Sequence, residues 1–198
     1  MSKFFDRLTP ELTGFIGAQP VFFVATAAPQ GRINLSPKGM DTFRVLDEKR
    51  VAYLDLTGSG NETAAHLLCD GRITIMFCSF GNNAEIARIY GRGAVIGPDH
   101  ARWPELAANF PELPGVRQIM EIGVESAMTS CGYGVPRMGE MTARDTLEKY
   151  WLKRTEEEKR DYWQTHNLRS IDGLPTGFAG TATPGSVVSQ FEIHLIKK

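Results

Sequence analysis

The residues with the clearest potential for chemistry lie in a glycine-rich turn, 58–62, between a predicted strand at 51–57 and a short helical pattern. A strand, turn and helix in this order direct backbone N–H groups and the positive end of a helix toward one point, which suits a phosphate group. Lys38 ends a separate short segment, and a lysine with helix-end amides would neutralise a phosphate dianion. The alternative is an ordinary turn before a capped helix, with Lys38 as a solvated charge. The motif alone leaves both interpretations open.

The turn also invites comparison with the dinucleotide fingerprint GxGxxG. Gly58 and Gly60 supply its first two glycines, but Thr63 stands at the third position. The helix that follows is short for a βαβ unit, and no acidic residue stands out at the end of a second parallel strand. A nicotinamide-binding enzyme with a parallel sheet is therefore the less favoured alternative.

Neither the histidines nor the cysteines show the spacing of a metal site. The chain has four histidines, three cysteines and no CxxC pair, so we expect no metal and no disulfide framework. Cys131 is interpreted as a small packing residue, with a reactive thiol as the alternative. We recognise no Ser/His/Asp arrangement in the sequence, and the catalytic residues stay unassigned.

Length and composition are those of a single globular domain, which we expect to span residues 1–198, with 42% hydrophobic and 23% charged residues. A net charge of −1 gives no reason to expect nucleic acid or an anionic membrane as a partner. No apolar run approaches the ~20 residues of a membrane helix, and the N-terminal residues lack the apolar core of a signal peptide. With cysteine usage that favours a reducing compartment, we expect a cytoplasmic protein.

Short strand patterns joined by turn residues predict an antiparallel barrel core at about 18–131. Tight connections, with only one brief helix between the third and fourth strands, argue against a doubly wound parallel sheet. Gly91 and Gly93 indicate a bulge or tight bend in the fifth strand. A helix at 101–110 should lie at the edge of the barrel. The six predicted strands cover 20–28, 33–36, 51–57, 72–77, 86–96 and 116–130.

Helix signals lie on both sides of these strands. Thr9 followed by proline predicts the start of a first helix, and the sequence 59–62 fits a capping box for the helix after the glycine turn. Residues 132–198 form an appendage with helix starts at 142–145 and 155–158, a polar loop at 167–177 and a closing strand at 187–196. Trp151 and Trp163 are interpreted as the core of this appendage, and as the alternative one of them stacks on a planar ring.

Arg88 and Tyr90 share one face of the fifth predicted strand. An inward-facing arginine would be costly unless it met an anion. Arg88 is therefore a candidate for contact with a cofactor or with another subunit.

Four segments together resemble the pyridoxamine 5′-phosphate oxidase-like flavoproteins, a family of FMN-binding split barrels. The segments are 33–38, 53–63, 72–77 and 88–93, and their order and spacing follow the family's arrangement of strand, strand–turn–helix, strand and strand. The resemblance implies a mainly β fold, a six-stranded antiparallel split barrel with flanking helices and a C-terminal helical appendage. It also implies a homodimer that binds FMN at its interface.

The same resemblance implies which residues hold the cofactor. The segment 34–38 would line the flavin with its lysine on the phosphate, 55–57 would pass beside the isoalloxazine ring, and 59–63 would close around the ribityl phosphate. Arg88 would come from the partner subunit. The implied cofactor-binding residues are Asn34, Leu35, Ser36, Lys38, Asp55, Leu56, Thr57, Ser59, Gly60, Asn61, Thr63 and Arg88.

Two departures from the true pyridoxamine phosphate oxidases argue against pyridoxamine 5′-phosphate as the substrate. Ile33 stands where those enzymes have an arginine, and their closing Arg-Leu-x-Pro is replaced by Leu-Ile-Lys-Lys198. We therefore expect an FMN-dependent oxidoreductase with an unidentified small-molecule substrate or electron donor, its flavin covered by the appended helices and the loop at 167–177. The alternative is a non-catalytic module of the same fold that binds or senses flavin, haem or deazaflavin.

Overall fold

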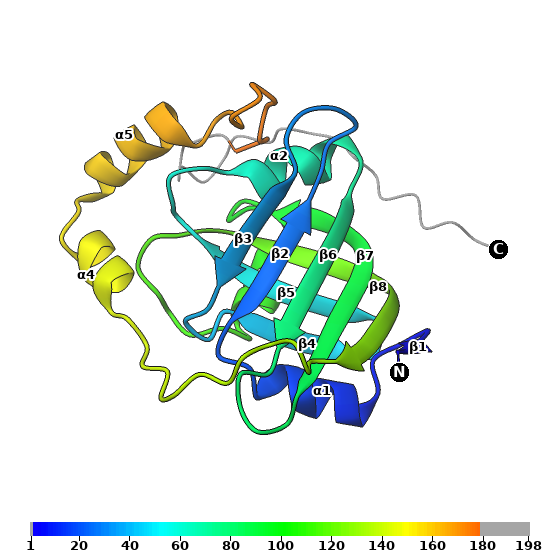
Figure 1. Cartoon of the computed structure of the whole chain (residues 1–198). Helices are drawn as coiled ribbons and strands as arrows, with labels where there is room; N and C mark the ends of the chain where they lie inside the picture. The colour runs from blue at the N-terminus through cyan, green and yellow to red at the C-terminus, as the bar shows by residue number, and fades with distance from the viewer. Residues whose placement is uncertain (1, 179–198) are drawn as a thin grey trace.

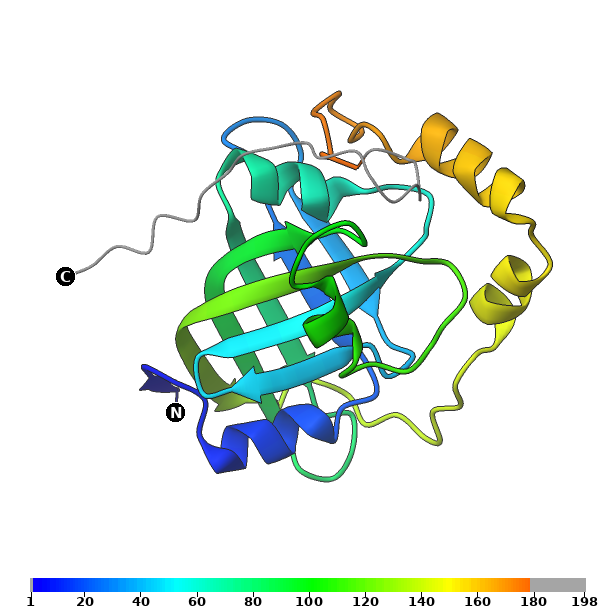
Figure 2. The same ribbon diagram turned by 180° about the vertical axis from the view of Figure 1, so that it is seen from behind.

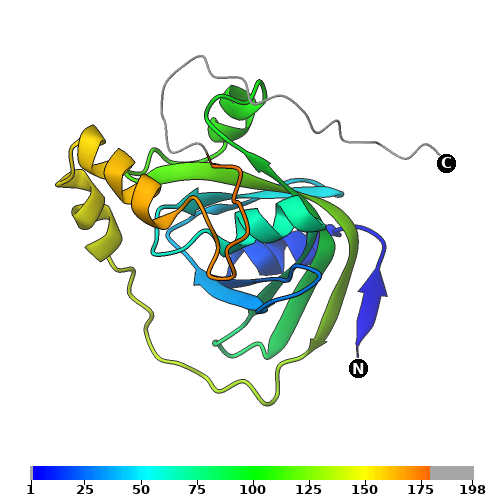
Figure 3. The same ribbon diagram turned by 90° about the horizontal axis from the view of Figure 1, so that it is seen from above.

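The computed structural model describes residues 2–178, and the body of the protein is one curved antiparallel sheet (Figure 1). The strand order is β3-β2-β6-β7-β8-β5-β4, and β1 pairs with β8. Figure 3 looks down on the sheet and shows how it curls around the interior as an open, split barrel. Within residues 2–178 the sheet has eight strands: β1 (Lys3–Phe5), β2 (Phe22–Thr26), β3 (Asn34–Lys38), β4 (Phe43–Asp47), β5 (Arg50–Leu56), β6 (Arg72–Cys78), β7 (Glu85–Ile96) and β8 (Val116–Cys131).

The predicted antiparallel split barrel is confirmed, but the predicted number of six strands is wrong. β4 was not predicted, and its end was taken as part of a turn at 46–50. The observed turn is narrower, because Asp47 of β4 pairs with Arg50 of β5 and only two residues lie between them. β1 has three residues, too few for a periodic pattern. The predicted strand at 187–196 lies outside the described residues.

A bulge is present at the predicted place, but it is in β8 and not in β7: Tyr90 and Gly91 pair with Ser126 and Val124, so that Glu125 is the extra residue. A Cβ atom on Gly91 would lie 2.1 Å from the carbonyl oxygen of Gly123 in β8. Only glycine permits so close an approach of two strands. The bulge lets the two longest strands bend, which closes the barrel on this side.

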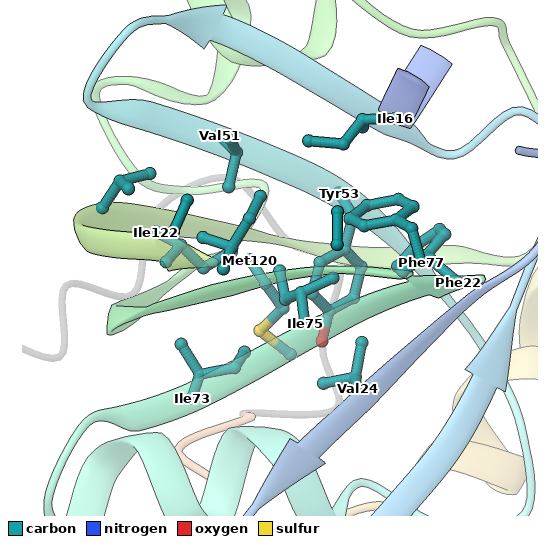
Figure 4. Close-up of a cluster of buried hydrophobic side chains, with 14 of the residues drawn as sticks. Ile16, Phe22, Val24, Val51, Tyr53, Ile73, Ile75, Phe77, Met120 and Ile122 are labelled. Carbon is teal, nitrogen blue, oxygen red and sulfur yellow. The ribbon is translucent and has the colours of Figure 1, made fainter. Parts of the chain in front are cut away.

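The core fills the interior of the curved sheet, where alternating residues of β2, β5, β6 and β8 meet (Figure 4). Val24, Tyr53, Ile75 and Met120 are fully buried there. Two helices lie at opposite ends of the sheet (Figures 1 and 2). They are α1 (Pro10–Gly17), whose first turn is capped by Thr9 as predicted, and α2 (Glu62–Cys69).

The capping box predicted for α2 is wrong. The helix begins at Glu62, so this residue is the first helical residue and not the third. The N-cap is Asn61, and its side chain makes no capping hydrogen bond. The side-chain amide of Asn61 instead forms hydrogen bonds with Gln118 of β8 and with the backbone of Asn167.

A smaller apolar cluster lies on the other side of β5 and β8, under the short helix α3 (Trp103–Ala107). The helix covers only half of the predicted span 101–110. Leu106 is its buried residue.

The predicted helical appendage is present and consists of α4 (Thr146–Leu152) and α5 (Glu156–His166). The capping box at Thr155 and Glu158 is confirmed, whereas the first helix starts after Asp145, a few residues later than predicted. We call α4, α5 and residues 167–178 the C-terminal unit. It lies beside α2 and the β2–β3 hairpin (Figures 1 and 3). None of the helices within residues 2–178 is long and apolar enough to cross a membrane.

Candidate functional site

A buried cluster of charged residues lies between β3, β5 and β8. Nζ of Lys38 donates to Oδ1 of Asp55 at 3.1 Å. Nη2 and Nε of Arg117 donate to Oδ2 of the same carboxylate at 2.7 and 3.1 Å. Gln118 adds a donor to Oδ2 at 2.9 Å. Both oxygens of Asp55 are therefore satisfied by residues from two other strands.

The strands place these side chains by an irregularity in pairing. Asp55 of β5 lies opposite Gln118 of β8, and the next residue, Leu56, lies opposite Val116. The register thus shifts by one residue, and Arg117 is the extra residue of the bulge. Because a bulge interrupts the alternation of side chains, two successive residues of β8 can both reach Asp55.

The electrostatics of the cluster leave one positive charge in excess. Asp55 and Arg117 are buried, and the Lys38 side chain is 23% exposed. Burial alone would raise the pKa of Asp55, but the charges of Arg117 and Lys38, with hydrogen bonds from Arg117 and Gln118, hold that pKa well below its usual range. One carboxylate therefore faces two cations, an arrangement that favours an anion near Lys38.

The glycine turn is connected to this cluster. Nη1 of Arg117 donates to the carbonyl oxygen of Gly60 at 3.1 Å, and Nε2 of Gln118 donates to Oδ1 of Asn61 at 2.7 Å. Since Asn61 is used in this way, the first-turn amides of α2 have no side-chain cap. Oε1 of Glu62, the first residue of α2, accepts a hydrogen bond from the backbone N–H of Ile171.

A second contact joins β3 to the start of α2. Nδ2 of Asn34 donates to Oγ1 of Thr63 and to Oγ1 of Thr26, both at 3.1 Å. The hydroxyl of Thr26 also lies 3.0 Å from Nδ1 of His66, on the next turn of α2. The two segments that the sequence singled out, 33–38 and 55–63, are therefore in direct contact.

The remaining predicted residues have different surroundings. Leu35 of β3 points outward and is 66% exposed, while Ser36 lies on the inward side of that strand. Ser59 is exposed and Leu56 is half-buried. Arg88 lies on β7, three strands from β3 in the sheet order, and donates to Oγ of Ser130. Within one chain, Arg88 is thus not brought to the turn.

Thr57 is enclosed by the C-terminal unit. The indole N–H of Trp151 donates to the Thr57 carbonyl oxygen at 3.0 Å, and that of Trp163 donates to its hydroxyl at 2.8 Å. The hydroxyl and the backbone N–H of Thr57 both donate to the carbonyl oxygen of Gly115 at 2.8 Å. Both tryptophans are buried core residues of the unit as predicted, and each indole also has a hydrogen-bonding role.

Asn167, the residue after α5, spans the turn. Its Nδ2 donates to the Gly58 carbonyl oxygen at 3.1 Å, and its own carbonyl oxygen accepts from Nδ2 of Asn61 at 3.3 Å. Its Oδ1 atom is buried and has no partner within the described part of the chain. The sequence drew no attention to Asn167 or to Arg117. For Arg117 there was a weak signal, because it and Gln118 are two adjacent polar residues directly before the apolar pair Ile119 and Met120.

Known proteins share both this sequence and this fold. The family model for pyridoxamine 5′-phosphate oxidase matches residues 8–131, which include every element from α1 to β8. The pyridoxamine 5′-phosphate oxidase family protein ustO of Aspergillus flavus is 35% identical over 195 residues, covering 88% of this chain and 78% of ustO.

Two solved structures carry the same architecture. The HupZ protein of Group A Streptococcus has a TM-score of 0.51 and 22% identity, covering 62% of this chain and 98% of HupZ. A Lactobacillus delbrueckii protein provisionally named a pyridoxamine 5′-phosphate oxidase has a TM-score of 0.51 and 19% identity, covering 62% and 94% of the two chains. Sequence identities this low show only that the folds are alike. The match to the family model and the 35% identity to the fungal relative show that the sequences are related as well. The chain belongs to the pyridoxamine 5′-phosphate oxidase family.

Proposed function

We propose that the protein is an FMN-dependent oxidoreductase. The observation that carries this proposal is the excess positive charge of Lys38 and Arg117 over Asp55, beside a glycine turn whose helix is uncapped. Lys38 and the turn amides would hold the phosphate of FMN. When bound, FMN would supply hydride or electron transfer.

The unpaired acceptor on Asn167 fits the same cofactor. A buried amide oxygen without a donor is costly, and the ribityl chain of FMN carries hydroxyl groups that can donate. Oδ1 cannot exchange places with Nδ2, because Nδ2 faces the Gly58 carbonyl oxygen. Asn167 therefore presents an acceptor beside the turn that is suited to a hydroxyl group.

Asp55 would act through its charge and not as a proton donor. Its low pKa keeps the carboxylate ionised at neutral pH, so that it orients the ammonium group of Lys38. The phenol of Tyr53 stays neutral, because burial raises its pKa. Neither Asp55 nor Tyr53 is thus poised to exchange a proton near neutral pH.

The proposal includes a homodimer. The outward side of β3 and the residue before it expose two large apolar side chains, Ile33 at 78% and Leu35 at 66%. Burying such side chains against a second copy would be favourable. Arg88, whose side chain bonds only a serine hydroxyl among the described partners, would then be supplied to the partner's site.

The first experiment is to purify the protein without added cofactor, record its visible spectrum, and identify what heating releases. Yellow protein that releases FMN supports the proposal. Colourless protein that also fails to bind added FMN would overturn it. A haem or deazaflavin spectrum would favour the non-catalytic binding module. Reduction by a nicotinamide, followed by reoxidation, would separate an enzyme from a module that only holds the flavin.

A further inference from the structure

We propose that the C-terminal unit holds the glycine turn in its binding conformation, and that Trp151, Trp163 and Asn167 are positioning residues. The inference rests on the proposed function in one respect, that the turn receives the phosphate of FMN. The contacts that carry it are independent of any ligand.

The first contact fixes the start of the turn. Trp151 and Trp163 come from different helices, yet both indole N–H groups end on Thr57. Together with Gly115, they engage the backbone N–H, the carbonyl and the hydroxyl of Thr57. All three side chains are buried. Thr57 therefore cannot rotate without breaking several buried hydrogen bonds.

The second contact fixes the rest of the turn. Asn167 donates to the carbonyl oxygen of Gly58 and accepts from the side chain of Asn61, so that one residue joins both ends of the segment 58–61. The carbonyl oxygen of Asn167 is itself held by the hydroxyl of Thr176 at 2.7 Å. The turn is thus attached to the loop after α5.

The third contact anchors that loop to the barrel. The N–H of Ile171 donates to Oε1 of Glu62 at 2.9 Å, and Asp172 accepts from the backbone N–H of Arg32 at 2.7 Å and pairs with its guanidinium. The C-terminal unit therefore bridges the turn, α2 and the β2–β3 hairpin. Its position on the turn is fixed from both sides.

These contacts matter because the turn is intrinsically flexible. Gly58 and Gly60 lose more conformational freedom on ordering than other residues would. A ligand that bound an unrestrained turn would have to supply this ordering free energy itself. A turn already ordered by the C-terminal unit binds its ligand more tightly, because the cost has been met on folding.

The test uses Trp163→Phe, which keeps an aromatic side chain, although a smaller one, and removes the N–H, with Trp103→Phe in α3 as the matched control. We expect FMN affinity to fall about 2- to 10-fold, the effect of one hydrogen bond, while riboflavin, which lacks the phosphate, binds almost as before. A shift in the phosphorus NMR signal of bound FMN should accompany the loss. Equal weakening of both flavins, or of neither, would overturn a positioning role.

Hydrogen exchange of the ligand-free protein provides the second measurement. The Thr57 amide, which donates to Gly115, should exchange faster in Trp163→Phe and in Asn167→Asp, but not in Trp103→Phe or Asn109→Asp. Asn109 is a matched control because its amide also donates to backbone carbonyls, in α3. Unchanged exchange at Thr57 would refute the inference. If the wild-type protein binds neither flavin, the proposed function fails, and exchange alone decides whether the unit holds the turn.

Discussion

Arg117 places two of its nitrogens on a single oxygen of Asp55, with Nη2 at 2.7 Å and Nε at 3.1 Å from Oδ2. This leaves the other oxygen, Oδ1, to Lys38. The carboxylate of Asp55 thus binds the buried Arg117 through one oxygen and the partly exposed Lys38 through the other. Asp55 stabilises the fold through Arg117 and presents Lys38 to the surface.

Substitution of Asp55 by asparagine should therefore be strongly destabilising. The buried guanidinium of Arg117 would lose its counter-charge, a loss that typically costs about 3–5 kcal/mol. The matched control is Asp47→Asn. Because the pair between Asp47 and Arg50 is exposed, this substitution should lower the free energy of unfolding by less than about 1 kcal/mol. Urea unfolding of the three proteins measures the difference. Similar midpoints for the two variants would show that the buried pair is not what stabilises this end of β5.

Acid should weaken the fold through the same residue. The folded state lowers the pKa of Asp55 relative to an unfolded value of about 3.9. Its stabilisation is therefore complete above roughly pH 4 and is lost as the pH falls toward the folded-state pKa. Urea midpoints measured at about pH 6 and about pH 3 should differ less in Asp55→Asn than in the wild type, and an equal difference would contradict this assignment.

Replacing Lys38 with alanine should weaken FMN binding by about 10- to 150-fold, the equivalent of losing one charge-assisted hydrogen bond of ~1.5–3 kcal/mol. The effect on stability should be small, because Asp55 keeps Arg117 as its partner. Lys49→Ala, on the turn between β4 and β5, is the control. Fluorescence titration with FMN gives both affinities. An unchanged affinity would remove Lys38 from the phosphate site.

A methyl group on Gly115 should displace Trp151. Gly115 has a φ of +76°, and a Cβ atom there would lie 2.5 Å from Cδ1 of the indole. Left-handed backbone costs about 1–2 kcal/mol for alanine, and overpacking adds about 1–3 kcal/mol. Gly115→Ala should lower the melting temperature, whereas Gly97→Ala, with open space around its Cβ position, should change it little. A wild-type melting temperature for Gly115→Ala would show that the indole can move without cost.

Removing the Asp172 side chain should loosen a segment without unfolding the protein. Its ion pair with Arg32 is largely exposed on the arginine side, so global stability should fall by no more than about 1 kcal/mol. Residues 168–177 should nevertheless become more sensitive to proteases, because the loop loses its contact with the β2–β3 hairpin. Asp145→Ala, which removes an exposed pair between Lys149 of α4 and the residue before that helix, serves as the control. Equal cleavage in both variants would mean that Asp172 does not hold the loop.

The fold could be read from the sequence wherever its signals are local. The strand predicted at 51–57, the glycines that follow and the start of α2 lie within one stretch of chain, and each was predicted within about two residues of its observed place. The number of strands was not, because β1 and β4 gain their stability from partners distant in sequence. Short strands of this kind carry little pattern of their own.

The site could be predicted only in part. The contact between Lys38 and Asp55 depends on a curled sheet that brings β3, at one end of the strand order, close to β5, the second strand from the other end, and neither the resemblance nor the periodicity gave this contact. Arg117 reaches the cluster because of a register shift that no propensity encodes. Trp151 and Trp163 were expected to be buried, but which backbone groups their N–H atoms meet follows from tertiary packing alone.

Two of the three tryptophans in the chain meet at Thr57, and the third, Trp103, belongs to α3. Most of the intrinsic tryptophan fluorescence should therefore come from side chains at the start of the glycine turn. Indole emission overlaps the absorption of oxidised flavins, so energy transfer would quench it when a flavin binds nearby. Unlabelled protein thus carries its own optical reporter of occupancy at the turn, and comparison with Trp103→Phe would isolate the signal of the other two.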